Sequence, residues 1–169
     1  MVVTRRILIG MIGAAVLAGC ADAALVASRQ AADELAGVHD PSCHLEALNG
    51  IFTALLVKED AAAAHDPFVR AVPLILRYDL GFHFAHRAAL LASLEGHAEQ
   101  AARLIGYGDA GKEARGHHVL EPLEITIRQR VIEYLRSQGP DWSRVEGWMR
   151  EGATLSDRDA YAHLIDASA

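Results

Sequence analysis

The feature that most constrains the fold of this chain is a recurring pattern in which an apolar helix ends at a tight turn and an alanine-rich helix follows. The pattern occurs in residues 16–24, 56–64 and 93–101. Its turns, at Gly19, Glu59 and Gly96, are 40 and 37 residues apart. Repeats built from a pair of helices have periods of about 34 to 47 residues, and one pair cannot bury its apolar face alone. The spacing therefore predicts stacked helix pairs.

The composition also favours helices. Of the 169 residues, 51% are hydrophobic but only 6% are aromatic, so the apolar content is mainly alanine and leucine, which are strong helix formers. No segment alternates apolar and polar residues as a half-buried strand does. We therefore predict an all-α fold of tandem antiparallel helix pairs, arranged as a right-handed superhelix like that of tetratricopeptide repeats, with a small C-terminal helical cap. About three pairs would occupy residues 1–116, and a helical extension would occupy residues 117–169.

Apolar stripes at helical spacing predict the individual helices. The first pair is expected at residues 4–18 and 21–36, the second from Ser42, and the third at residues 81–94 and 98–114. In the extension, helices are expected from Pro122, around residues 143–150, and after a capping box that begins at Ser156. The stripe residues are Ala24, Ala27, Ala31 and Leu35 in the first pair, Leu45, Leu48, Phe52 and Leu55 in the second, Phe82, Ala85, Ala89 and Ala92 in the third, and Leu123, Ile127, Val131 and Leu135 in the extension.

Two prolines interrupt this pattern in the second pair. Pro67 and Pro73 both fall within the expected partner helix. An interior proline removes a backbone hydrogen bond and usually kinks or stops a helix. Asp66 followed by Pro67 is typical of an N-cap and a first helical residue. We therefore expect this helix to be broken and to begin again at Pro67.

The N-terminus allows a second interpretation. Arg5 and Arg6 precede an apolar stretch at residues 7–17, as in a secretion signal. Residues 17–20 resemble the lipobox of bacterial lipoproteins, in which Cys20 would become the lipidated first residue. The apolar stretch is shorter than the roughly 20 residues that span a bilayer. The alternatives are a signal peptide at residues 1–19, which implies a lipid-anchored envelope protein, and the first helix of a repeat, which the 40-residue spacing favours.

Two further segments, residues 90–107 and 151–156, resemble the C-terminal tetratricopeptide-like tail of bacterial ATPase-type transcriptional regulators with a winged-helix or similar DNA-binding domain. In that tail, an alanine- and leucine-rich helix is followed by a Glu-Gly turn and by Ala-Ala-Arg-Leu-Leu-Gly, and an acidic-Gly-small-Leu-Ser turn precedes the last helix. The resemblance covers residues 45–167 and implies an interaction or effector-sensing role. The chain lacks the phosphate loop G-x-x-x-x-G-K-[ST] and the basic recognition helix, so the resemblance implies neither ATP hydrolysis nor DNA binding.

The chain offers little that predicts catalysis. Its net charge of -6, from 22 acidic and 16 basic residues, argues against a nucleic-acid surface. His83 and His86, at i and i+3, are the best metal-ligand candidates, but no H-E-x-x-H occurs and zinc needs three or four ligands. Cys43 and His44 are adjacent, so on a helix they point about 100 degrees apart. We predict no catalytic, cofactor or metal residues, no disulfide framework for Cys20 and Cys43, and histidines at the surface or at helix ends.

A set of aromatic residues is the predicted interaction surface. Stacked helix pairs form a concave face, and aromatic residues are enriched at interfaces; the alternative is that these side chains belong to the core. We predict a cytoplasmic protein that binds a protein or small-molecule effector without direct nucleic-acid contact, and without membrane contact unless the lipobox functions. Self-association would cover the open faces of the end repeats. The candidate residues are Tyr78, Phe82, Tyr107, Trp142 and Trp148.

Overall fold

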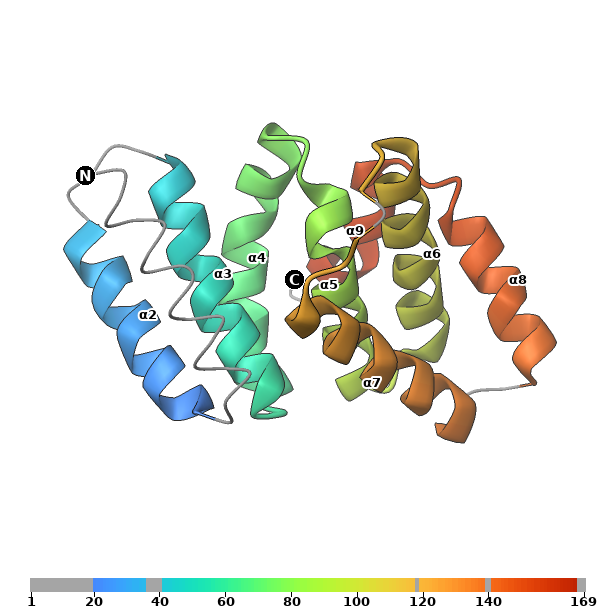
Figure 1. The fold of residues 1–169 in the computed structure, drawn as a ribbon, viewed down its shortest axis with the longest axis horizontal. Helices are drawn as coiled ribbons and strands as arrows, with labels where there is room; N and C mark the ends of the chain where they lie inside the picture. The colour runs from blue at the N-terminus through green and yellow to red at the C-terminus, as the bar shows by residue number, and fades with distance from the viewer. Residues whose placement is uncertain (1–19, 36–40, 118, 139–140, 167–169) are drawn as a thin grey trace. The chain divides into compact units, whose positions relative to one another are not determined.

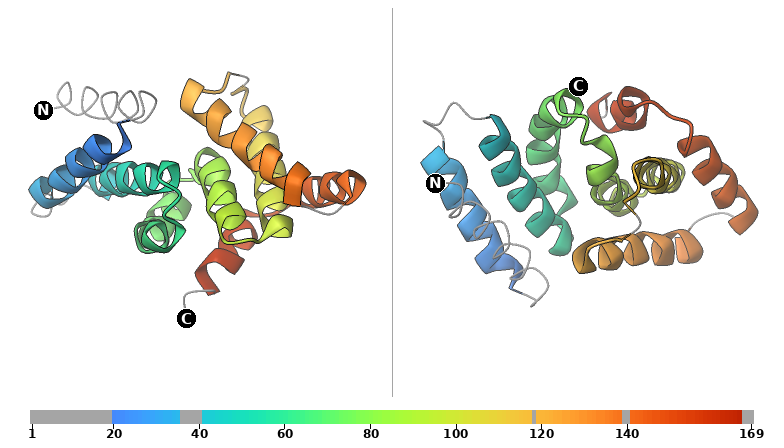
Figure 2. Two further views of the ribbon diagram at one scale, coloured as in Figure 1. Left: turned by 90° about the horizontal axis from the view of Figure 1, so that it is seen from below. Right: turned by 45° about the horizontal axis from the view of Figure 1, so that its top comes forward.

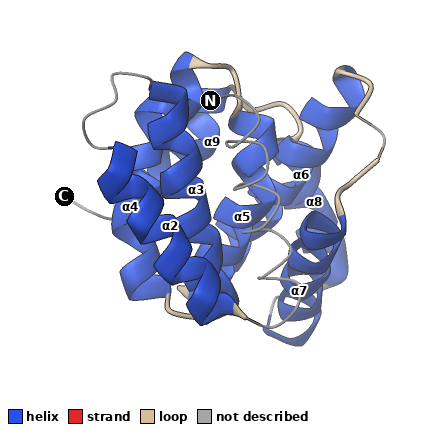
Figure 3. Ribbon diagram, turned by 60° about the vertical axis from the view of Figure 1, so that its left-hand side comes forward, coloured by secondary structure: helices blue, strands red, loops and turns tan. Residues whose placement is uncertain are grey.

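The computed structural model describes residues 20–35, 41–117, 119–138 and 141–166, and these contain eight α-helices and no strand (Figures 1 and 3). The all-α prediction is confirmed. The stacking of the helices into a tetratricopeptide-like superhelix stays a prediction. The helices are α2 (Ala21–Leu35), α3 (Pro41–Val57), α4 (Ala61–Arg77), α5 (Gly81–Leu94), α6 (Ala98–Ala114), α7 (Pro122–Gln138), α8 (Trp142–Gly152) and α9 (Asp157–Asp166).

The chain forms two compact units, one ending at Leu74 and the other beginning at Ile75, so that α4 runs from the first into the second. In the first unit, α2 packs on α3. The predicted stripe of α3 is buried throughout, and the rings of Phe52 and Phe68 join α3 to α4 with 5.1 Å between centroids. Ala24 and Ala31 of α2 are also buried. The expected helix at residues 4–18 and the turn at Gly19 lie outside the described residues.

The expected break in α4 is wrong. The helix is continuous from Ala61 to Arg77, with Pro67 and Pro73 inside it. Its N-cap is Asp60 and not Asp66, because the Asp60 carboxylate accepts a hydrogen bond from the backbone N–H of Ala63 at 3.0 Å. Pro67 therefore lies in the second turn, where it is buried. A proline removes only its own hydrogen bond, and the remaining backbone bonds and the buried face keep the helix continuous.

Four helices end in the same way. The second residue after each helix adopts a positive φ, and the N–H of the next residue bonds to a carbonyl five residues earlier, as in the Schellman cap. Asp79 and Gly116 lie 37 residues apart, the same interval as Glu59 and Gly96. The turns predicted at Glu59 and Gly96 are thus confirmed, although two of the four positions carry a residue other than glycine. The bonds run from Asp60 to Leu55, Leu80 to Ile75, His97 to Ala92 and His117 to Lys112.

The second unit is built around the pair formed by α5 and α6. These helices pack on each other across the turn at Gly96. α7 packs mainly on α5 and also on α6, whereas α8 packs on α6 (Figure 2). α9 contacts both α5 and α6. The predicted extension therefore shares its packing with the third pair. Its predicted stripe is buried in α7 at Leu123, Ile127, Val131 and Leu135.

None of the described helices has both the length and the apolar character needed to cross a bilayer. The last helix begins at the predicted cap. The Ser156 hydroxyl accepts the backbone N–H of Asp159 at 3.2 Å. In a complete capping box, the side chain three residues after the cap also accepts the backbone N–H of the cap residue. Here the Asp159 carboxylate accepts the Ser156 hydroxyl instead, at 2.6 Å.

Candidate interaction site

Two glycines allow α6 and α8 to approach at backbone distance. A Cβ atom on Gly106 would lie 1.8 Å from the carbonyl oxygen of Met149, and one on Gly152 would lie 1.9 Å from the carbonyl oxygen of Arg103. No side chain fits at such distances, so both positions require glycine for this packing. The Arg103 guanidinium also bridges to Glu151 of α8, with 2.8 Å between Nη2 and Oε2.

These contacts involve the two segments that resemble the regulator tail. Arg103 and Gly106 belong to the segment at residues 90–107, and Glu151 and Gly152 open the segment at residues 151–156. Four neighbouring residues of the first segment line the same core, since Ala101, Ala102, Leu104 and Ile105 are all fully buried. The two segments are thus parts of one packing arrangement in the second unit.

Buried polar groups hold α9 in place. The Tyr161 hydroxyl donates to the carbonyl of Gly81 at 2.5 Å, and the Gln100 amide donates to the carbonyl of Ala160 at 2.8 Å. The Tyr107 hydroxyl donates to the Asp157 carboxylate at 2.6 Å. Burial, together with the Asp157 carboxylate, raises the pKa of Tyr107 far above its ordinary value. Tyr107 therefore keeps its proton and remains a hydrogen-bond donor at neutral pH.

Two of the predicted interaction residues lie in the interior. Tyr107 is buried against Tyr161, with ring centroids 6.1 Å apart. Phe82 is buried beneath the guanidinium of Arg115, which lies 4.3 Å above its ring. Tyr78 is 39% exposed. The structure therefore does not bring the three together as one exposed surface.

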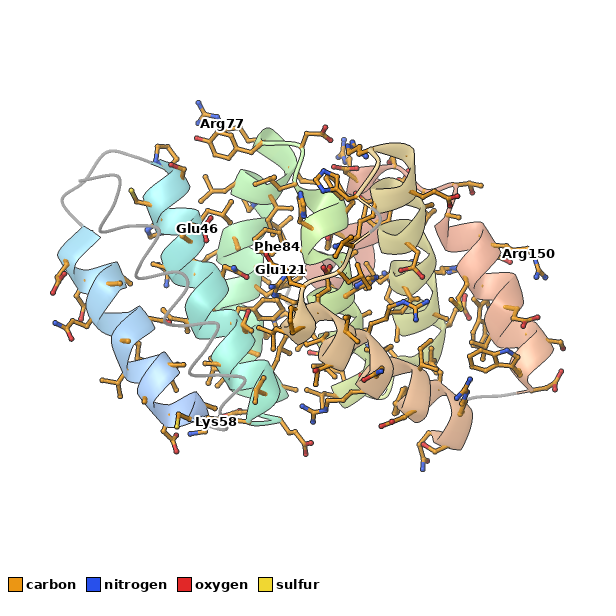
Figure 4. The ribbon with its side chains drawn as sticks, in the orientation of Figure 1. Glu46, Lys58, Arg77, Phe84, Glu121 and Arg150 are labelled. Atoms are coloured by element: carbon orange, nitrogen blue, oxygen red, sulfur yellow. The ribbon has the colours of Figure 1, made fainter. Side chains whose placement is uncertain are left out.

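The two tryptophans are half-buried on α8, but they occupy different flanks of the helix. Six residues separate them, which is about 240 degrees of rotation around an α-helix. Trp142 packs under Arg136 of α7 and donates to Glu146, whereas Trp148 packs under Arg144. The outward face between them carries Arg150, which projects away from the helix (Figure 4). Of the five predicted residues, Phe82 and Tyr107 are thus buried, Trp142 and Trp148 are half-buried, and Tyr78 is exposed.

A cluster that the sequence did not predict lies where α5, α6 and α7 meet. His86 of α5 is fully buried between two carboxylates. Its Nε2 lies 2.9 Å from Asp109 of α6, and its Nδ1 lies 3.3 Å from Glu124 of α7, an ion-pair distance without hydrogen-bond alignment. Arg128 of α7 donates to Asp109, with 2.7 Å between Nη2 and Oδ2, and Lys112 of α6 pairs with Glu124. These five residues are the charge cluster.

The charge cluster keeps its carboxylates ionised. Burial alone would raise the pKa of Asp109, but the hydrogen bonds from His86 and Arg128 outweigh it and lower the pKa to about 2. Burial also opposes ionisation of Glu124, but His86 and Lys112 again outweigh it and lower the pKa of Glu124 to about 2.

The arrangement of signs in the charge cluster also sets the register of α7. The anion Asp109 of α6 pairs with the cation Arg128 of α7, and the cation Lys112 of α6 pairs with the anion Glu124 of α7. Sliding α7 by one turn would oppose like charges. Buried ionic groups commonly specify alignment in this way, even where they add little stability. A search for opposite charges beside the predicted stripe of α7 could have found Glu124 and Arg128, but not their partners.

The remaining candidates are dispersed. The prediction of surface or helix-end histidines is wrong for His86, which is buried in the core between the carboxylates of Asp109 and Glu124. Cys43 lies on α3 and Cys20 precedes α2, and neither forms a disulfide. In the part of the chain that the structure describes, no three His, Cys, Asp or Glu side chains gather as metal ligands would. The charge cluster instead pairs each carboxylate with a cation.

Comparisons with protein-family models, curated proteins and solved structures find no match to this chain.

Proposed function

We propose that this chain is a non-catalytic helical-repeat module that binds a protein or small-molecule effector, in the manner of the tail of an ATPase-type transcriptional regulator. The proposal includes the cytoplasmic location and the stacked, tetratricopeptide-like arrangement of the pairs. No covalent chemistry is required of any residue. Its partner would be recognised through the helical surface.

The observation that carries the proposal is the contact between α6 and α8. The two segments that resemble the regulator tail are 45 residues apart along the chain, between Gly106 and Glu151. They pack on each other through Gly106, Gly152 and the Arg103–Glu151 ion pair. Short motifs that arise by chance in an alanine- and glycine-rich chain have no reason to meet in space. Their packing together supports a shared origin with that tail.

The test is to recover the chain at its natural level from the cells that produce it, and to identify stoichiometric partners by native mass spectrometry. We expect a protein with a nucleotide-binding domain to accompany it, or an effector mass to be bound. Gly106→Ala should lose that partner, because it separates α8 from α6. Gly147→Ala is the matched control, since Gly147 has only the Arg150 side chain nearby, at 3.9 Å. Recovery of the folded chain alone would contradict the proposal.

The lipid-anchored alternative is favoured by the position of Cys20. This residue is exposed and immediately precedes α2, and its carbonyl accepts the backbone N–H of Ala24 at 3.0 Å. Cleavage before Cys20 would therefore remove no residue of a described helix. The intact mass of the chain from the same natural preparation distinguishes a processed N-terminus from an unprocessed one. A mature chain that begins at a lipid-modified Cys20 would establish the alternative, and an unprocessed N-terminus would refute it.

A further inference from the structure

Helix α9 depends on the surface that receives it. It contacts α5 and α6, which precede it by more than one helix along the chain. Its buried residues, Ala160, Tyr161 and Leu164, lie on one face of the helix. α9 has ten residues, fewer than the roughly 12 to 15 that an isolated helix needs to be stable in water. The contacts with α5 and α6 therefore stabilise it.

Three residues of α5 and α6 bond to defined positions along α9. The Tyr107 hydroxyl donates to the carboxylate at the first position, and the Gln100 amide donates to the backbone carbonyl at the fourth. The Gly81 carbonyl accepts the tyrosine hydroxyl at the fifth. We call Gly81, Gln100 and Tyr107 the α9 site. A helix satisfies all three residues only when its own donor and acceptors stand at these positions.

The α9 site also fits closely at Gly81. A Cβ atom on Gly81 would lie 2.2 Å from the Tyr107 hydroxyl oxygen and 2.8 Å from a carboxylate oxygen of Asp157. Any side chain at Gly81 would therefore displace the hydrogen bond between Tyr107 and Asp157. Both the available volume and the hydrogen-bonding groups of the site match α9.

The link between α8 and α9 is short and is closed by turns. It consists of residues 153–156, and its first two residues are exposed. The N–H groups of Thr154 and Leu155 bond to the carbonyls of Glu151 and Gly152. Four extended residues span about 14 Å, more than the diameter of a helix, about 10 Å. An opened link is therefore long enough to carry α9 to an adjoining copy.

We propose that two copies of this chain pair by exchanging α9, so that the α9 of each copy occupies the α9 site of the other. The occupant is a second copy because α9 is the helix whose hydrogen-bonding groups match the site, and every copy carries it. The exchanged contacts are those that form within one copy, which makes exchange of an identical element a low-cost route to a dimer. This pairing goes beyond the proposed binding of an effector and does not depend on it.

The experiment mixes two variants of the whole chain that have complementary defects. Gly81→Ala blocks the site and leaves an intact α9 without a place to bind. Leu164→Asp puts a charge on the buried face of α9 and leaves an intact site empty. By sedimentation velocity, we expect the unaltered chain to dimerise, each variant alone to be monomeric, and the mixture to form a 1:1 pair. The pair should be at least about tenfold tighter than either variant with itself.

The control mixture combines Gly81→Ala with Arg158→Ala. Arg158 lies on the exposed face of α9, so this variant keeps its own α9 in place and should pair at least about tenfold more weakly than Leu164→Asp does. Monomers in the complementary mixture, equal pairing in the control mixture, or a strictly monomeric unaltered chain would overturn the exchange.

A second variant of the site protects the experiment against misfolding. If circular dichroism shows that Gly81→Ala does not fold, Gln100→Leu replaces it, because this change removes the donor to α9 at similar volume. The same outcomes then decide. The measurement uses the purified chain alone, so failure of the exchange would leave the proposed effector binding untouched.

Discussion

α7 and α8 pack on the same pair of helices, but different forces hold them. α8 approaches α6 through two glycines, with backbone against backbone. α7 is aligned by opposite charges around a fully buried histidine and anchored by an apolar stripe. The contact of α8 depends mainly on the absence of volume, which pH does not change, and its one ion pair, Arg103–Glu151, is partly exposed. The contact of α7 depends on buried charges, so solution conditions should alter it more than the contact of α8.

The largest effect is expected when volume is added at the α8 contact. Gly106→Ala places a Cβ 1.8 Å from the Met149 carbonyl oxygen, so the helices must separate. We expect a loss of about 3 kcal/mol in unfolding free energy, at the upper end for overpacking. Urea unfolding followed by tryptophan fluorescence measures it, because both tryptophans lie on α8. Gly147→Ala, in open space, should instead stabilise by up to about 1 kcal/mol; equal losses would refute the glycine argument.

A smaller loss is expected when charge is removed from the α7 contact. Glu124→Gln preserves shape but leaves Lys112, which is 6% exposed, without its carboxylate. We expect a loss of about 2 kcal/mol, because an uncompensated buried cation remains. Adding Lys112→Met removes that cation and should recover more than half of the loss, as measured by thermal unfolding. If the double variant is less stable than Glu124→Gln alone, the compensation argument fails.

Acid should weaken the α7 contact through Glu124 of the charge cluster. The pKa of Glu124 is lowered to about 2 in the folded unit, against about 4.3 when unfolded. Its ionisation therefore stabilises the fold above about pH 4.3, and this contribution is lost as the pH falls towards 2. Allowing for solvent screening, we expect about 1 kcal/mol less stability at pH 3 than at pH 5 from this group. Glu124→Gln should lack that part of the pH dependence, and exposed Glu133→Gln should retain it.

The smallest effect concerns a turn instead of a helix contact. Glu59 adopts φ 60 at the end of α3, a conformation that costs a residue with a Cβ about 1 kcal/mol or more. Glu59→Gly removes this cost but makes the unfolded chain more flexible, so we expect a net gain of about 0.5 kcal/mol. Denaturant unfolding would detect it, and Gly96→Ala, at φ 83, should lose stability. A loss in Glu59→Gly would contradict the strain at this turn.

The helices themselves were largely predictable from local patterns. The bounds of α5 and α6 agree with the predicted ranges, and the stripes of α3, α5 and α7 are buried as expected. The predicted break at Pro67 and Pro73 is wrong because the buried face of α4 outweighs the two backbone hydrogen bonds that the prolines remove. The cap at Asp60 was equally local, but the Asp-Pro pattern at Asp66 concealed it.

The candidate sites were less predictable, because they are made between helices. Phe82 and Tyr107 were proposed as surface residues, and both are buried by helices distant in sequence. His86 was considered as a metal ligand because of its spacing from His83, yet its partners are Asp109 and Glu124. Both partners lie too far from His86 along the chain for a helical spacing to link them with it.

The sequence by itself determined that the chain forms helices, where most of them begin and end, and which face of each is apolar, because hydrogen bonding and periodicity act within a few residues. The tertiary structure alone decided that Gly106 meets the backbone of Met149 and Gly152 that of Arg103 between α6 and α8, and that a histidine occupies the junction of α5, α6 and α7. Such contacts depend on which helices become neighbours. Helices of similar pattern could pack in several orders, and only steric fit and the pairing of opposite charges select one of them.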